Sequence, residues 1–72
     1  MSADKNMKVR WRVLGGEWQE TDTEAKTVGE LMASLGLSAE EYLPSIGGKL
    51  VTEDEELKEG TEVTFIPVVS GG

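Results

Sequence analysis

Hydrophobic and polar residues alternate along residues 8–14, which is the period of a strand with one buried face. The apolar face carries Val9, Trp11 and Val13, and the polar face carries Lys8, Arg10 and Arg12. Gly15-Gly16 follows, a dipeptide that readily adopts the positive φ angles of a tight hairpin turn. Residues 17–23 predict a polar return strand at a sheet edge, with acidic side chains that discourage pairing with other chains. We expect Trp11 in the core and Trp18, on the return strand, partly exposed.

After residue 26 the spacing of apolar residues changes from the alternation of a strand to the spacing of a helix. Apolar residues recur at i, i+3, i+4 and i+7, namely Val28, Leu31, Met32 and Leu35. Thr27 and Glu30 have the spacing of a capping box, and Gly36 is placed to end the helix in the left-handed conformation. Gly29 in the first turn costs up to about 1 kcal/mol relative to alanine. A small residue there is consistent with a helix that lies close to the sheet.

The second half of the chain predicts one short turn, one short hairpin and a final strand. The turn spans residues 38–43 and ends before Pro44, because the residue preceding a proline disfavours helix. Strands at 45–46 and 49–51 flank Gly47-Gly48. In the last strand, Val63 and Phe65 share one face, and the other face carries Glu62, Thr64 and Ile66. Pro67 cannot donate to a sheet ladder, so we expect pairing to stop there.

The order strand, strand, helix, hairpin, strand predicts an α+β fold of the β-grasp type. In this fold a mixed sheet of four to five strands packs on one helix, with the first and last strands parallel in the middle. A ferredoxin-like fold would need a second full helix, and no segment supplies one. We expect a flexible leader over residues 1–6, the β-grasp domain over 7–67 and a flexible C-terminal Gly-Gly tail over 68–72.

Composition excludes several kinds of chemistry. The 72 residues contain no cysteine and no histidine, which removes disulfides, thiolate nucleophiles and the usual general base. The net charge of −7 argues against nucleic acid as a partner, and no apolar stretch is long enough for a membrane span. The acidic run at 53–56 lacks the glycine and the alternating ligand spacing of a calcium loop. We therefore expect a cytoplasmic protein with no bound metal or cofactor.

Three stretches carry a resemblance to a known family: residues 27–31, residues 47–51 and above all residues 58–72, which end in Pro67-Val68-Val69-Ser70-Gly71-Gly72. With these the chain resembles the sulfur-carrier and modifier branch of the ubiquitin superfamily. That branch holds the ThiS and MoaD proteins, the Urm1-type modifiers and the small archaeal modifier proteins, and the chain is closest in style to the last. The family's second hairpin usually reads Asn-Gly where this chain has Gly47-Gly48. The MoaD ending often carries two prolines where this chain has Pro67-Val68.

The resemblance implies that the carboxylate of Gly72 is the reactive group. An E1-like activating enzyme of the MoeB, ThiF or UbaA type would adenylate it with ATP, after the tail residues Val68, Val69, Ser70 and Gly71 enter the enzyme. The activated carbonyl then becomes a thiocarboxylate for a sulfurtransferase or sulfur-accepting enzyme, or an amide with lysines of target proteins. The chain itself would be a monomeric carrier without catalytic residues. Glycines suit this role because a tail without side chains fits a narrow channel.

The activating enzyme also needs a surface to hold. Ile66 is predicted on the outer face of the last strand, where Lys8, Arg10 and Arg12 of the neighbouring first strand would also lie. An apolar residue beside the tail suggests docking, and the cations suggest steering of an acidic partner surface. The alternative is an ordinary solvated strand face. Three functions follow for the chain: sulfur carriage, protein modification, or a β-grasp interaction domain with an inert tail.

Overall fold

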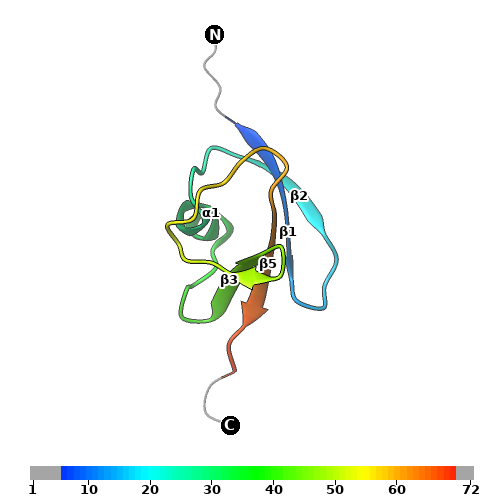
Figure 1. The fold of residues 1–72 in the computed structure, drawn as a ribbon, viewed down its shortest axis with the longest axis vertical. Helices are drawn as coiled ribbons and strands as arrows, with labels where there is room; N and C mark the ends of the chain where they lie inside the picture. The colour runs from blue at the N-terminus through cyan, green and yellow to red at the C-terminus, as the bar shows by residue number, and fades with distance from the viewer. Residues whose placement is uncertain (1–5, 70–72) are drawn as a thin grey trace.

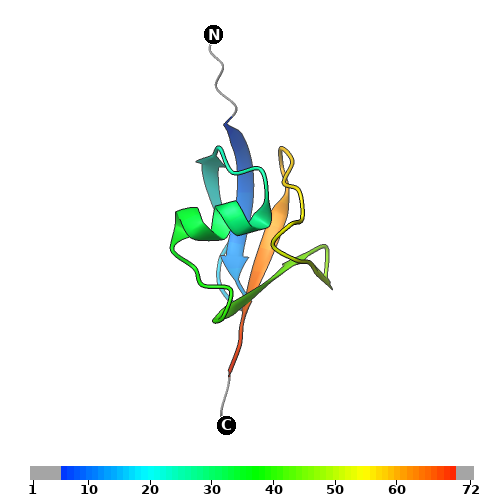
Figure 2. The same cartoon turned by 90° about the vertical axis from the view of Figure 1, so that its left-hand side faces the viewer.

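The computed structural model describes residues 6–69. Its elements are β1 (Met7–Val13), β2 (Gln19–Thr23), α1 (Val28–Leu35), β3 (Tyr42–Ile46), β4 (Lys49–Leu50) and β5 (Glu62–Pro67). The strands form one sheet in the order β2-β1-β5-β3-β4, with β1 and β5 parallel and the other neighbours antiparallel. Helix α1 crosses one face of this sheet (Figure 1; Figure 2). The predicted β-grasp fold is confirmed, with five strands and with the first and last adjacent in the middle.

The hydrophobic core lies between α1 and the two central strands. Its buried members are Val9, Ala25, Val28, Leu31, Met32, Leu57, Val63 and Phe65. Trp11 is half-buried and packs against this cluster, with its ring centroid 6.1 Å from that of Phe65. The inward face predicted from the period of two is therefore the face that meets the helix.

Both ends of α1 follow local sequence signals. The Thr27 hydroxyl accepts a hydrogen bond from the backbone N–H of Glu30, as the capping box predicts. The Glu30 carboxylate accepts from the N–H of Lys26, at 2.8 Å, instead of from the N–H of Thr27. At the other end Gly36 has φ 77° and ψ 21°, the left-handed conformation that was expected.

Gly29 lies against the acidic loop at 53–56, so its expected role in bringing the helix close to the sheet is wrong. Its N–H donates to the carbonyl of Glu53, and the N–H of Val28 donates to the carbonyl of Glu55, both at 2.9 Å. These bonds satisfy N–H groups that the first turn of a helix leaves without partners. A Cβ atom at Gly29 would lie 3.0 Å from Glu53 Cβ and 3.3 Å from the Glu53 carbonyl oxygen.

Gly29→Ala is expected to destabilise the domain by about 1–3 kcal/mol, because the added methyl crowds the loop that caps the helix. Helix propensity alone predicts the opposite, a gain of up to about 1 kcal/mol. Urea unfolding decides between them, and Ala33→Gly on the exposed part of the same helix is the matched control. The control should cost about 1 kcal/mol through propensity alone. A more stable Gly29→Ala protein would refute the role given to the loop.

Strand β3 begins at Tyr42, three residues before the predicted start, and Pro44 lies inside it. Pro44 pairs with Phe65 of β5, and its carbonyl accepts from the N–H of Val51 on the other side, at 3.0 Å. The nitrogen and carbonyl of one strand residue point to the same side, so the missing N–H of Pro44 removes no bond to β5. The prediction treated the proline as a strand boundary, whereas here it is placed where no donor is needed.

The tight turn expected from Gly47-Gly48 is present, whereas the one expected from Gly15-Gly16 is wrong, because residues 14–18 form a longer loop between β1 and β2 and only Gly15 of the pair has a positive φ. Gly15 has φ 87°, and Gly47 and Gly48 have φ 62° and 85° in the β3–β4 turn. Positive φ at both central residues is the property of the turn that matches the twist of antiparallel strands. The return strand is shorter than expected and starts at Gln19.

Within residues 6–69, no helix is both long enough and apolar enough to cross a membrane. The same residues hold no group of three acidic, cysteine or histidine side chains arranged to bind a metal ion. The acidic run at 53–56 instead uses its backbone carbonyls to support α1.

Candidate functional site at the root of the tail

The root of the C-terminal tail remains attached to the sheet for one residue beyond Pro67. Pro67 pairs with Tyr42, and the N–H of Val68 then donates to the carbonyl of Glu41 at 2.8 Å. Strand pairing ends at Pro67, as expected, and this one backbone hydrogen bond follows it. A proline removes only its own donor, and the following residue again has one to offer.

Beyond this bond the chain leaves the domain. Val68 is 41% exposed and Val69 is 87% exposed, and the chain passes out below β5 (Figure 1). Ser70, Gly71 and Gly72 lie outside the described residues, so the predictions about them stay predictions. The described chain ends at Val69, outside the body of the domain (Figure 1).

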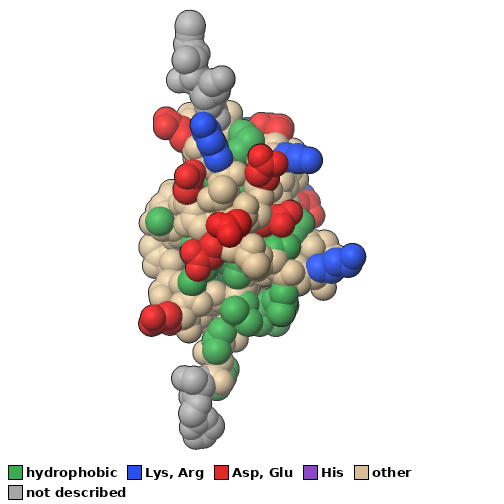
Figure 3. Space-filling view, turned by 60° about the vertical axis from the view of Figure 1, so that its left-hand side comes forward, with side chains coloured by type: hydrophobic (Ala, Val, Ile, Leu, Met, Phe, Trp, Pro, Cys, Tyr) green, Lys and Arg blue, Asp and Glu red, His purple; other side chains and the backbone are tan. Residues whose placement is uncertain are grey.

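Apolar side chains gather where the tail leaves. Ile66, half-buried on the outer face of β5, pairs directly with Leu43 of β3, which is 41% exposed. Leu14 is 54% exposed and continues β1 beside β5, since its N–H donates to the carbonyl of Phe65 at 2.9 Å. We call Leu14, Leu43, Ile66 and Val68 the apolar patch. Figure 3 shows hydrophobic side chains gathered at this end of the molecule, while acidic side chains spread over the body above.

A shallow apolar groove adjoins the patch at Leu43. It has a volume of about 260 Å³ and lies between the start of β3 and the segment after β4. Its lining consists of Ala39, Tyr42, Leu43, Pro44, Val51, Thr52 and Glu53. Exposed apolar surface therefore extends from the outer sheet face around β3, which is the kind of surface that marks an interaction site.

The three predicted cations lie on the outer face of β1 but have different neighbours. Arg10 forms an ion pair with Glu62 of β5 at 2.7 Å. Lys8 is opposite Asp22 of β2, at the end of β1 farthest from the tail. Arg12 pairs with Thr64 and is the cation nearest to the apolar patch. The structure therefore places the three on one face without gathering them into a single cluster.

Trp18 joins two of these cations, a contact that the sequence alone did not predict. It is half-buried, as expected, and the guanidinium carbon of Arg12 lies 4.7 Å from the centroid of its ring. The corresponding distance for Arg10 is 5.4 Å. Both distances are within the range of cation–π attraction.

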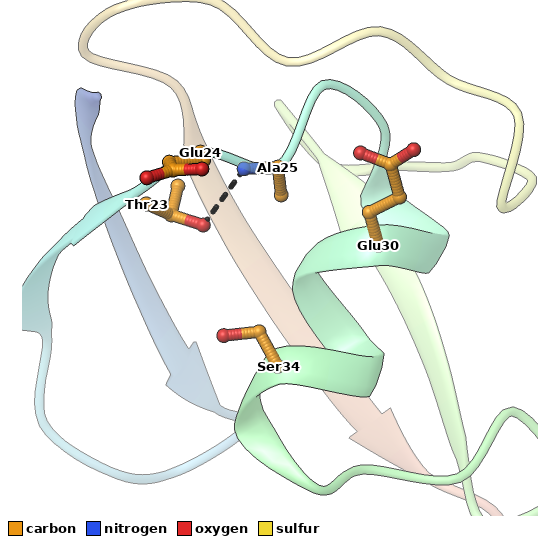
Figure 4. A pocket seen from close by; sticks show the side chains of 5 residues that line it. All are labelled: Thr23, Glu24, Ala25, Glu30 and Ser34. Atoms are coloured by element: carbon orange, nitrogen blue, oxygen red, sulfur yellow. Dashed lines mark hydrogen bonds between the residues drawn. The ribbon is translucent and has the colours of Figure 1, made fainter. Parts of the chain in front are cut away.

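A second hollow lies on the helix side of the sheet, away from the apolar patch and the cations of β1. It has a volume of about 360 Å³ and is lined by Thr23, Glu24, Ala25, Glu30 and Ser34. Figure 4 shows these side chains between the end of β2 and α1, with the Thr23 hydroxyl accepting from the Ala25 N–H at 3.0 Å. Its two carboxylates, Glu24 and Glu30, belong to exposed residues. We assign it no chemistry.

A protein-family model, that of the ThiS family, matches residues 10–72. The chain belongs to the ThiS family. The match includes the tail as well as the domain, and it makes this protein a small ubiquitin-like carrier or modifier protein.

Solved structures place this ThiS-family protein among ubiquitin-like folds. The ubiquitin of Caldiarchaeum subterraneum superposes with a TM-score of 0.64 at 20% identity, covering 93% of this chain and 99% of that one. SAMP1 from Haloferax volcanii superposes with a TM-score of 0.65 at 19% identity, covering 90% and 99%. The N-terminal ubiquitin-like domain of the 4931431F19Rik protein gives 0.68 at 14% identity, covering 97% and 82%. At such identities these likenesses establish the fold.

Proposed function

We propose that this ThiS-family protein is a carrier whose Gly72 carboxylate is activated by an E1-like enzyme. The observation that carries the proposal is the position of the tail. It leaves the sheet at Val69, directly beside the apolar patch and the adjoining groove. An enzyme that binds the patch is thereby positioned to receive the residues that follow.

The chemistry belongs to the enzyme. A carboxylate oxygen of Gly72 attacks the α-phosphate of ATP, pyrophosphate leaves, and an acyl-adenylate results. A hydrosulfide ion from a sulfur donor then attacks the acyl carbon, AMP leaves, and the product is a thiocarboxylate, which transfers its sulfur to a cofactor or to tRNA. Two terminal glycines leave the reacting carbonyl open, because neither carries a side chain. Since the chain has no cysteine and no histidine, it supplies neither a thiol nor an imidazole of its own.

A second use of the same adenylate is attack by a lysine amine of another protein, with loss of AMP and formation of an isopeptide bond. The third possibility is an interaction domain with an inert tail. The exposed apolar patch fits all three functions, since each requires a docking surface. The fate of Gly72 distinguishes them.

The experiment is mass spectrometry of the tagged protein recovered from cells of its own organism, with a Gly71-Gly72 deletion as the control. Carriage predicts a C-terminal peptide in which sulfur replaces one oxygen of Gly72. Modification predicts branched peptides on other proteins. Trypsin cleaves after Lys58, so the remnant on a target lysine is residues 59–72. If neither product is found and the deletion leaves growth unchanged, the inert-tail function is correct.

Docking at the apolar patch predicts that Ile66→Asp and Leu43→Asp each raise the KM of the activating enzyme for this protein by about 10- to 100-fold. A carboxylate at either position would be buried against an apolar partner surface, which is costly. The assay is ATP–pyrophosphate exchange with the E1-like enzyme of the source organism. Ala33→Asp adds the same charge on the helix side and should leave KM unchanged. Equal effects of all three variants would contradict docking at the patch.

A further inference from the structure

Arg12 is held by two contacts that leave part of its guanidinium group available. Its Nε donates to the Thr64 hydroxyl at 3.3 Å, and its guanidinium carbon lies 4.7 Å from the Trp18 ring centroid. Stacking on an aromatic face uses none of the N–H donors, since it acts through the flat side of the guanidinium. Among the described residues, Arg12 has no ion pair, whereas Arg10 is paired with Glu62. The terminal N–H groups of Arg12 are thus fixed in place and unpaired within residues 6–69.

Arg12 lies close enough to the apolar patch for one partner surface to contact both. Arg12 is level with Thr64 of β5, and Ile66 lies two residues farther along the same outer face. Residues i and i+2 of a strand are separated by about 7 Å. A surface that covers Ile66 therefore also reaches Arg12.

We propose that Arg12, positioned by Trp18, binds an Asp or Glu carboxylate of the E1-like enzyme at the margin of the apolar patch. This inference rests on the proposed function and assigns a binding group within its docking surface. A protein with a net charge of −7 repels an acidic surface at long range, so attraction of a carboxylate has to come from a local contact. Arg presents a planar fork of donors that matches a carboxylate, and a fixed fork loses less freedom on binding.

The surroundings favour a single carboxylate over a polyanion. Arg10 lies between two acidic residues, because it is paired with Glu20 of β2 on one side and with Glu62 of β5 on the other. A chain of phosphates running along β1 would meet these acidic side chains, whereas one carboxylate approaching Arg12 from the side of the patch would not. Arg10 is already compensated, and Lys8 lies at the far end of β1.

The test is the KM and kcat of ATP–pyrophosphate exchange for a set of variants with the E1-like enzyme of the source organism. Arg12→Ala should raise KM about tenfold with kcat unchanged, the size expected for one charge-assisted hydrogen bond. Arg12→Lys should recover only part of this loss, because an ammonium lacks the fork and the stacking face. Lys26→Ala and Lys58→Ala, which each remove an exposed cation outside β1, are the controls and should change KM less than about twofold.

Trp18 is a positioning residue in this proposal, and its effect should depend on Arg12. Trp18→Ala should raise KM in the wild-type background and have no further effect in the Arg12→Ala background. The effect of Arg12→Ala should also shrink as salt is raised, unlike that of Ile66→Asp. Thermal unfolding of each variant establishes that the domain is folded.

Three outcomes would overturn either the role of Arg12 or the proposed function. If Ile66→Asp raises KM while Arg12→Ala does not, the apolar docking stands and the carboxylate-binding role of Arg12 is wrong. The same holds if Trp18→Ala and Arg12→Ala act additively, because Trp18 would then not act through Arg12. If deletion of Gly71-Gly72 leaves exchange intact, the proposed function itself fails, whatever the result at Arg12.

Discussion

Deletion of Gly71 and Gly72 is expected to reduce ATP–pyrophosphate exchange to the level of the activating enzyme without its protein substrate. The shortened protein ends in the carboxylate of Ser70. An extended chain advances about 3.3–3.6 Å per residue, so this carboxylate falls about 7 Å short of the position that Gly72 reaches. Reacting atoms need to approach within about 3–3.5 Å, so a carboxylate that ends about 7 Å short does not reach the α-phosphate of ATP.

Binding should survive the deletion, because the apolar patch and Arg12 are unchanged. The truncated protein is therefore expected to compete with the full-length protein for the enzyme, with an inhibition constant near the KM of the full-length protein. Ser70→Ala, which keeps the length and the terminal glycines, is the control and should support normal exchange. Full exchange by the deleted protein would show that adenylation, if it occurs, takes place elsewhere.

The second large effect concerns stability. Phe65→Ala is expected to cost about 3–5 kcal/mol, since it opens a cavity in the middle of the core. A domain of this size has a free energy of unfolding of about 4–11 kcal/mol, so this single change removes a large part of it. Phe65 is fully buried and packs against Trp11. Thermal or urea unfolding monitored by circular dichroism measures the loss.

Ile66→Ala is the matched control for Phe65→Ala, because the two residues are neighbours on opposite faces of β5. Ile66 is only half-buried, and its removal should cost at most about 2 kcal/mol. A loss at Ile66 equal to that at Phe65 would contradict the assignment of Ile66 to the outer face. It would also remove the physical basis for docking through this residue.

Elements with local signals were predictable from the sequence. The helix ends at residues that specify its caps by themselves, Thr27 and Gly36, and the structure has both. The period of two in the first and last strands placed Val9, Val63 and Phe65 inward, and all three are fully buried. A β-grasp order of elements followed from these faces and from the single helix.

Features that depend on contacts between distant segments were not predictable. The pairing of Leu43 with Ile66 requires the register of β3 against β5, and the sequence around Pro44 suggested that β3 begins later. Leu43 was therefore missed as a member of the apolar patch. Leu14 was missed because its place beside Ile66 depends on the parallel register of β1 against β5. The contact between Trp18 and Arg12 depends on how β2 lies against β1, which no local pattern specifies.

The bond from Val68 to Glu41 and the approach of Gly29 to Glu53 were missed for the same reason. Each joins residues far apart in the chain, and each was interpreted from one residue type alone: proline as the end of pairing, glycine as room for the sheet. In the described structure Val68 bonds to the carbonyl of Glu41, and Gly29 lies against Glu53 and not against the sheet. The family match, in contrast, covers the tail that the described structure leaves out.

The most direct test of the central claim is the intact mass of the purified protein after incubation with its E1-like enzyme, ATP and a sulfur donor. Sulfur carriage at Gly72 predicts a mass increase equal to the difference between one sulfur and one oxygen atom, located at Gly72 by fragmentation and absent without ATP. An unchanged mass, in a reaction where the same enzyme converts another ThiS-family protein, would contradict it.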